Sequence, residues 1–244
     1  MILAKIGFLI VVFLSNIIQC VTGFAGTVLA MPFSIMLVGF GTAKPILNVL
    51  GIAASVGVVI QHRKVIRWPT FGEILAVALP GMALGTYLRP QLIGYEVLLY
   101  KALGLIVLAF DLMNVISLRT KKPIVGEGKA VGYPLLALGG AVHGVFTCGG
   151  PLIVTYASVK LKENEQFSAT LSMVWIVLNS IMFITDLAAG CFVRETNQLL
   201  FACLALLLIA LRLGHRIAEK LSRKSFMVLT DTLMAISGVS LLVK

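Results

Sequence analysis

Two glycine-rich clusters interrupt the apolar sequence, TGFAGT at 22–27 and HGVFTCGGP at 143–151. A helix that restarts after a glycine turn presents free N–H groups and a partial positive charge, and glycine lets a ligand approach that backbone closely. Threonine hydroxyls within the clusters add hydrogen-bond donors. The clusters therefore predict an anion-binding site. The predicted substrate-binding residues are Thr22, Gly23, Gly26, Thr27, Thr147, Cys148, Gly149 and Gly150, with Asn48 and Asn179 from the helices that follow the clusters.

Titratable side chains in or near the apolar segments are candidates for coupling or gating. His143 begins the second cluster, and an imidazole suits a proton-coupled role, with a histidine bonded to backbone as the alternative. Asp111, Asp186 and Asp231 are costly in a membrane and are therefore functional candidates, with paired or solvated carboxylates as the alternative. Arg89 is predicted in an outer loop, where it either attracts anions or is a surface charge. Of these, His143, Asp111 and Asp186 are the predicted coupling or gating residues.

Cys20 and Cys148 lie at or beside the two clusters, which allows a second interpretation. Two thiols that meet could exchange electrons as a transmembrane thiol–disulfide relay. Neither cysteine has the CxxC-type setting that activates a thiol, so the relay is the alternative and not the main hypothesis. The four cysteines lack metal-ligand spacing, and the chain lacks the GxSxG and HExxH motifs of hydrolases. We therefore predict no enzyme activity, no cofactor and no metal.

The two clusters must be positioned by membrane-spanning helices. Of the 244 residues, 59% are hydrophobic and only 12% are charged, and the mean hydropathy is +1.03. Apolar runs of about 18 to 25 residues recur along the chain, long enough to cross roughly 30 Å of hydrocarbon. These runs predict a polytopic α-helical membrane protein that begins with a helix rather than a cleaved signal. The net charge of +10 is assigned to cytoplasmic loops and lipid contacts, not to nucleic-acid binding.

Two of the apolar segments are too long for a single crossing. At about 1.5 Å per residue, segment 2–41 would measure roughly 60 Å and segment 130–159 roughly 45 Å, and tilt cannot absorb that excess. Because each contains one glycine-rich cluster, we predict that each is a broken element, either a re-entrant hairpin or two short helices. Gly81 and Gly85, by contrast, predict a helix-packing face. The other apolar segments are predicted at 44–61, 69–88, 95–118, 166–189, 197–213 and 225–243.

The distribution of the 20 lysines and arginines favours the folded-back form of both broken segments. If each broken segment crosses once, the charges divide ten against ten between the two sides. If each folds back, one side keeps six and the other fourteen, which is the asymmetry that the positive-inside rule expects. The six are Lys5, Lys44, Arg89, Lys101, Arg194 and Lys244. We therefore predict both termini on the extracytoplasmic side, with the loops 62–67, 119–129, 160–165 and 212–224 in the cytoplasm.

The segments also divide into two halves of the same kind. The predicted fold is all-α and transmembrane, with two inverted repeats, each a broken or re-entrant helical hairpin followed by three transmembrane helices. The first repeat is residues 1–118, the cytoplasmic linker is 119–129 and the second repeat is 130–244. The alternative is that two helical membrane halves look alike without duplication. Two broken elements that meet near the middle of the membrane are typical of a transporter's binding site.

The sequences QCVTGFAGTVLAMP (19–32) and GVFTCGGPLIVTY (144–156) resemble the paired signatures of the TauE/SafE family. The resemblance extends from about residue 7 to residue 243. Members of that family are small membrane permeases associated with export of sulfite and organosulfonates, and some with uptake of other small organic anions. The resemblance implies anion transport without ATP, which agrees with the lack of a GxxxxGK[ST] phosphate loop.

The main prediction is a secondary transporter of small sulfur-containing anions, of the sulfite, thiosulfate or organosulfonate type, that works by alternating access. Its expected partners are the anion, the lipid bilayer and a proton or another coupling ion, and its expected location is the inner cell membrane. The prediction names a substrate class and leaves the anion, the direction of transport and the oligomeric state open.

Overall fold

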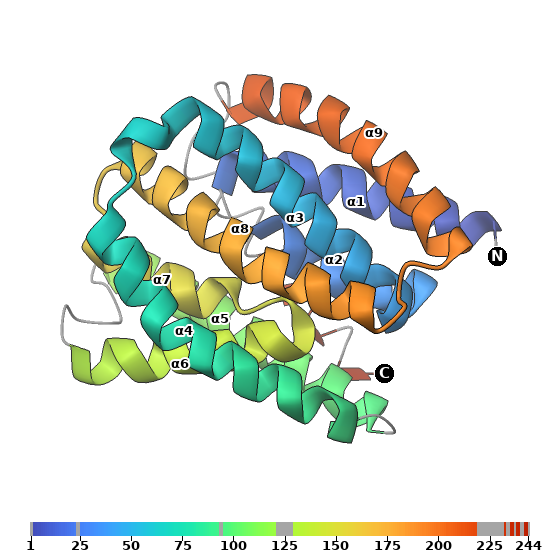
Figure 1. Ribbon diagram of the computed structural model, residues 1–244, viewed down its shortest axis with the longest axis horizontal. Coiled ribbons are helices and arrows are strands. Elements are labelled where there is room, and N and C mark those ends of the chain that lie inside the picture. The colour runs from blue at the N-terminus through green and yellow to red at the C-terminus, as the bar shows by residue number, and fades with distance from the viewer. Residues whose placement is uncertain are drawn as a thin grey trace.

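The computed structural model describes residues 2–22, 25–92, 95–120 and 129–218, together with residues 232, 235, 236, 238, 239, 242 and 243. Within these residues the chain forms nine α-helices, two short 3-10 helices and no strand (Figure 1). The α-helices are α1 (Ile2–Thr22), α2 (Ala25–Val38), α3 (Phe40–His62), α4 (Trp68–Leu88), α5 (Glu96–Thr120), α6 (Lys129–Phe146), α7 (Gly150–Lys160), α8 (Asn164–Ala188) and α9 (Arg194–Ala218). The 3-10 helices are η1 (Arg63–Val65) and η2 (Arg89–Leu92).

The predicted all-α membrane fold is confirmed for the described part of the chain. Five helices are long and apolar enough to cross a bilayer, namely α1, α3, α4, α8 and α9. The shorter α2 and α6 are also apolar over most of their length. Short helices occur where the glycine-rich clusters divide the two over-long segments, into α1 and α2 and into α6 and α7.

The first over-long segment is a helical hairpin. Helices α1 and α2 pack along each other, and they run in opposite directions, since Gly7 lies beside Leu37 whereas Gly26 lies beside Gln19. A Cβ atom on Gly26 would stand 2.3 Å from the Gln19 Oε1 atom and 2.8 Å from the Ser15 carbonyl oxygen. Only glycine therefore fits where α2 turns back against α1.

The second over-long segment is also a hairpin, formed by α6 and α7. Gly132 lies beside Tyr156 at its open end, and Gly139 lies beside Leu152 nearer the turn. A Cβ atom on Gly149 would stand only 1.9 Å from the Gly139 carbonyl oxygen, so the turn closes too tightly for any side chain there. Of the two forms that the sequence left open for a broken segment, the structure has the folded-back one in both places.

Packing groups the helices into two bundles. The first bundle contains α1, α2, α3 and α9, and the second contains α4, α6, α7 and α8. Large buried side chains fill each one. Those of the first bundle include Phe8, Met31, Ile46 and Leu207. Those of the second bundle include Ile74, Leu136, Ile153 and Leu178.

Each half of the sequence contributes one helix to the bundle of the other half. Helix α4 belongs to the first half but packs on α6, and α9 belongs to the second half but packs on α1. Helices α3 and α8 pack against each other and join the two bundles at the centre (Figure 1). The predicted halves 1–118 and 130–244 are therefore divisions of the sequence, and they do not coincide with the two bundles in which the helices pack.

The contact between α4 and α6 depends on small residues, as the spacing of Gly81 and Gly85 predicts. A Cβ atom on Gly81 or on Gly85 would stand 2.1 Å from a carbonyl oxygen of α6. On α6, the same atom on Gly140 or Gly144 would stand 2.0 Å or 2.3 Å from a carbonyl oxygen of α4. Glycines from both helices thus bring the two backbones into direct contact.

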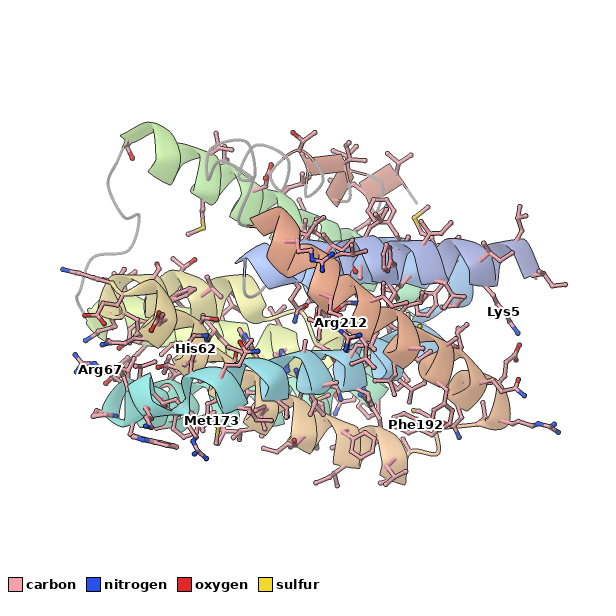
Figure 2. All side chains as sticks on the ribbon, turned by 90° about the horizontal axis from the view of Figure 1, so that it is seen from above. Lys5, His62, Arg67, Met173, Phe192 and Arg212 are labelled. Atoms are coloured by element: carbon pink, nitrogen blue, oxygen red, sulfur yellow. The ribbon has the colours of Figure 1, made fainter. Side chains whose placement is uncertain are left out.

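Charged residues mark the two ends of the molecule. Figure 2 shows Lys5 and Phe192 at one end and His62 and Arg67 at the opposite end, and we refer to these as the Lys5 end and the Arg67 end. At the Lys5 end, the Lys5 ammonium forms an ion pair with Glu195 and so joins α1 to α9. In the second bundle, the Tyr133 hydroxyl donates to Glu73 at 3.0 Å and joins α6 to α4.

Candidate functional site

A cavity lies where the two helical hairpins meet α3 and α8. It lies about midway along the helices, because Gly51, one of the residues that line it, is at the centre of α3. Residues from both bundles surround it, so a relative movement of the bundles would change its shape. The residues that line it are Gln19, Thr27, Val28, Gly51, Ser55, His143, Thr147, Cys148, Gly150, Trp175 and Asn179.

The second helix break has an unusual backbone at Thr147. Helix α6 ends at Phe146, and Thr147 follows with a φ of 59°, the one positive φ among the non-glycine residues that the structure describes. This conformation costs a non-glycine residue about 1–2 kcal/mol, and a β-branched side chain makes it rarer still. Strain of this kind persists where the surroundings hold it, often at a functional site. In this conformation, Thr147 is one of the residues that line the cavity.

Helix α7 begins at the cavity without a capping side chain. Gly149 is its N-cap residue, and no side chain bonds to the first backbone N–H groups. Proline stands in the first turn, where a missing N–H does no harm. Gly150 lines the cavity, so the positive end of the α7 dipole lies at the cavity wall.

Several buried polar atoms at the cavity have no hydrogen-bond partner within the described residues. They are Thr147 Oγ1, Trp175 Nε1, Asn179 Oδ1 and both ring nitrogens of His143. The exposed fractions of these four residues are 3%, 7%, 6% and 2%. A buried polar group without a partner costs about 1–3 kcal/mol, so such a cluster calls for a ligand. Thr147 Oγ1, Trp175 Nε1 and one nitrogen of a neutral His143 can donate, whereas Asn179 Oδ1 only accepts. The lining contains no carboxylate, so the three donors favour an anion.

A hydrogen bond from α3 holds the backbone of α8 at Asn179. The Asn48 side-chain amide donates to the backbone carbonyl oxygen of Asn179 at 3.0 Å. One turn further along α3, Gly51 leaves room for the Asn179 amide, which lies 2.9 Å from where a Cβ atom would stand. Asn48 therefore supports the cavity without lining it.

Cys148 joins the two breaks. Its thiol is buried, 3% exposed, and lies 3.9 Å from the Thr27 carbonyl oxygen in the first hairpin. Across the same contact, Val28 lies beside Gly150. The first turn of α2 and the start of α7 thus adjoin in the wall of one cavity.

A comparison with protein families provides the identification. The model of the family described as Sulfite exporter TauE/SafE matches residues 8–241, nearly the whole chain. The protein belongs to the TauE/SafE family. Searches of curated proteins and of solved structures gave no match. TauE/SafE membership indicates a multi-pass membrane permease that transports sulfite or related sulfur compounds.

In this TauE/SafE protein the cavity brings together many of the predicted residues. Those that line it are Thr27, His143, Thr147, Cys148, Gly150 and Asn179. Gly26 and Gly149 instead allow the close turns of the two hairpins. Asp111 lies on α5, outside the cavity lining. Gly23 and Asp231, with the side chains of Cys20 and Thr22, lie outside the described residues.

Five lining residues were not predicted from the TauE/SafE sequence, namely Gln19, Val28, Gly51, Ser55 and Trp175. The position of Trp175 in the sequence could have identified it as a candidate. Tryptophans of membrane helices collect at the lipid–water interface, whereas Trp175 is near the middle of α8, where its indole N–H requires a polar partner. The Trp175 ring stacks on the His143 imidazole, with centroids 6.0 Å apart.

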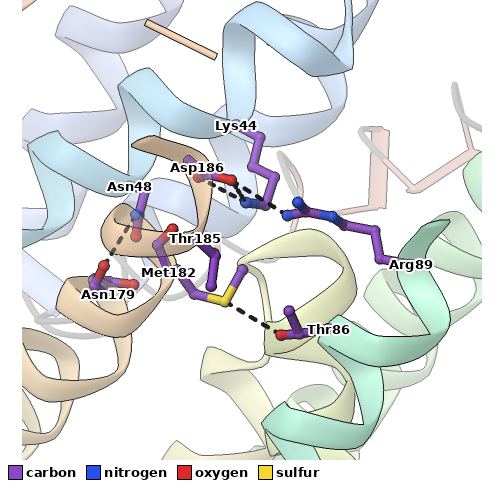
Figure 3. Close-up of polar contacts among 8 residues, drawn as sticks. All are labelled: Lys44, Asn48, Thr86, Arg89, Asn179, Met182, Thr185 and Asp186. Carbon is purple, nitrogen blue, oxygen red and sulfur yellow. Dashed lines mark hydrogen bonds and ion pairs between the residues drawn. The ribbon is translucent and has the colours of Figure 1, made fainter. Parts of the chain in front are cut away.

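A buried charge cluster lies one turn beyond Asn48, toward the Lys5 end. The Lys44 ammonium lies 2.5 Å and 2.7 Å from the two carboxylate oxygens of Asp186, and the Arg89 guanidinium lies 3.3 Å from one of them (Figure 3). Lys44 and Asp186 are 2% and 1% exposed. Asp186 is thus a paired carboxylate, one of the alternatives left open by the sequence, and Arg89 is its second partner.

Proposed function

We propose that this TauE/SafE protein is a secondary transporter of small sulfur-containing anions, of the sulfite, thiosulfate or organosulfonate type, that binds its substrate in the cavity between the two helix breaks. The observation that carries the proposal is the cluster of buried polar atoms without partners, which includes the donors of Thr147, Trp175 and His143. An anion of this class accepts hydrogen bonds on several oxygens at once, so it would satisfy Thr147, Trp175 and His143 together. The uncapped start of α7 adds a favourable dipole.

The size of the cavity favours a compact ligand. Its volume is about 30 Å³, and because a water molecule needs roughly 10–15 Å³, this space fits about two waters. A compact oxyanion such as sulfite is closer to this volume than an organosulfonate with a carbon chain. Longer sulfonates would require the two bundles to separate further.

The helix packing supports transport by alternating access through inverted repeats. If the two hairpins and the helices that follow them are matched in chain order, α1, α2, α3 and α4 correspond to α6, α7, α8 and α9, respectively. Under this match, the contact of α4 with α6 corresponds to that of α9 with α1, and the contact of α3 with α9 corresponds to that of α8 with α4. Such a two-fold pattern lets the bundles exchange roles between two conformations. The charge asymmetry favours both termini on the extracytoplasmic side.

A thermal-shift panel tests the proposed site. We expect one or more of sulfite, thiosulfate and sulfoacetate to raise the melting temperature of the purified protein, with sulfate, taurine and acetate as comparisons, since a ligand that binds only the folded state stabilises it. Thr147→Val should weaken the anion's apparent affinity by about tenfold, the value of a hydrogen bond of roughly 1.4 kcal/mol. Without ligand, the same variant should melt no lower than wild type, because it removes a buried hydroxyl that has no partner.

Thr147→Ser is the matched control, since it keeps the hydroxyl and should keep the anion response. Trp175→Phe should repeat the loss of affinity through the indole N–H. If Thr147→Val kept the full anion response, or if none of the sulfur anions shifted the melting temperature of wild type, the proposed site would be wrong.

Cys148→Ser separates the transporter from the thiol relay. The relay requires both Cys20 and Cys148, so serine at position 148 would abolish it. Because the contact of the Cys148 thiol with the Thr27 carbonyl oxygen is long, 3.9 Å, its loss costs little, and we expect Cys148→Ser to keep anion uptake within about threefold of wild type. This is well under the tenfold effect of losing one hydrogen bond. Uptake of labelled sulfite into proteoliposomes is the measurement, and its complete loss would favour the relay.

A further inference from the structure

Among the side chains that the structure describes, the charge cluster at the Lys5 end carries one more positive charge than it balances. Two cations, Lys44 and Arg89, share the single carboxylate of Asp186. Lys44 belongs to the first bundle and Asp186 to the second, so the pair also fastens the bundles together. The Arg89 side chain is 22% exposed and reaches from the buried pair toward the surface. A cluster built only to hold the bundles together would need no second cation.

One face of α3 leads from this cluster to the cavity. At spacings of four, three and four residues, it carries Lys44, Asn48, Gly51 and Ser55. Residues at such spacings share one side of a helix, and the last two line the cavity. Along the helix, Lys44 stands about 10 Å from Gly51, at 1.5 Å per residue.

The facing side of α8 repeats this arrangement. Asp186, Asn179 and Trp175 follow each other at spacings of seven and four residues, and the last two line the cavity. The hydrogen bond from Asn48 to the Asn179 carbonyl oxygen joins the two faces midway (Figure 3). Polar residues therefore recur along the α3–α8 interface from the charge cluster to the cavity, with Met182 between Asp186 and Asn179 on α8.

We propose that Lys44 and Arg89 form a second anion-binding site, in which a small oxyanion replaces the Asp186 carboxylate as the counter-ion of Lys44. This inference rests on the proposed function, because the anion is the transported substrate on its way to or from the cavity. Separating the bundles at the Lys5 end pulls Asp186 away from Lys44 and leaves a buried ammonium without a partner. An arriving oxyanion removes that cost, so the cavity opens at this end when substrate is present.

Arg89→Gln tests the surplus charge without breaking the fold. It leaves Lys44 and Asp186 as a balanced pair, so the melting temperature should stay close to that of wild type. Uptake of ³⁵S-labelled sulfite, thiosulfate and sulfoacetate into proteoliposomes should fall at least fivefold for the anion that wild type transports. Arg89→Lys, which keeps the charge, should restore most of the uptake.

The double variant Lys44→Met/Asp186→Asn tests the counter-ion exchange. Removing both charges keeps the packing, so we expect a melting temperature near that of wild type together with uptake at least tenfold lower. Asp186→Asn alone should bind the same anion at least tenfold more tightly in detergent, because the competing carboxylate is gone. An unchanged anion affinity for Asp186→Asn, or wild-type uptake by the double variant or by Arg89→Gln, would overturn this inference and leave the cavity site standing. Absence of uptake by wild type itself would instead remove the proposed function, and this inference with it.

Discussion

Asp186→Asn is expected to lower the free energy of unfolding by about 3–5 kcal/mol, the typical cost of removing one partner from a buried ion pair. The physical reason is the Lys44 ammonium, which is 2% exposed and has both oxygens of Asp186 as its partners. Asparagine keeps the shape of the side chain but not the charge, so Lys44 would remain buried beside a second cation.

Thermal or chemical denaturation of the purified protein in detergent measures this effect. Adding Lys44→Met to Asp186→Asn should recover stability to within about 1 kcal/mol of wild type, because replacing both members of a buried pair is often neutral. Glu195→Gln is the matched control, since it breaks the exposed ion pair with Lys5 and should leave the denaturation midpoint unchanged. A midpoint for Asp186→Asn equal to that of wild type would show that Lys44 finds water or another partner.

Gly140→Ala is expected to destabilise the protein by about 1–3 kcal/mol or more, although alanine favours helices. The new methyl group would stand 2.0 Å from the Ala78 carbonyl oxygen and 2.8 Å from its carbon, both parts of the α4 backbone. Backbone cannot rotate out of the way as a flexible side chain can, so α4 and α6 must separate along their whole contact. Overpacking of this kind usually costs about 1–3 kcal/mol, and here it also weakens a glycine-mediated contact.

Gly57→Ala provides the comparison. Gly57 is also inside a helix, α3, but a Cβ atom there meets nothing within 4 Å. The substitution should therefore leave the melting temperature unchanged or raise it, as expected from the roughly 1 kcal/mol advantage of alanine over glycine in a helix. Equal melting temperatures for the two variants would mean that α4 and α6 are not in backbone contact.

The sequence was sufficient to locate the two breaks, because their causes are local. A run that is too long for one crossing must be interrupted, and the glycines at 22–27 and 143–151 are the obvious places. The folded-back path followed from the distribution of lysine and arginine, which depends on the whole chain but on no particular contact. Thr147, Cys148 and Gly150 could be predicted to lie together because they stand within four positions of each other in the second cluster, and all three line the cavity.

The charge cluster could not be predicted in this way. Lys44 and Asp186 are 142 positions apart in the sequence, and each looks like a residue near a helix end that water could reach. Only the packing of α3 on α8 shows that both are buried and opposed. Gln19 was missed for a similar reason, since its place in the cavity depends on how the first hairpin approaches the other bundle.

The exchange of α4 and α9 between the bundles determines the order in which the molecule can be assembled. Lys5 and its partner Glu195 are separated by 190 positions, so α1 lacks one of the two helices it packs on until most of the chain has been synthesised. In the second bundle, α4 is synthesised before the α6–α7 hairpin on which it packs. The first bundle, by contrast, is incomplete until α9 has been synthesised. Contacts between distant parts of a chain are slow to form and leave apolar surfaces exposed in the meantime. During synthesis, the N-terminal hairpin is therefore the part of this protein that depends longest on lipid, or on another protein, to cover the face that α9 finally occupies.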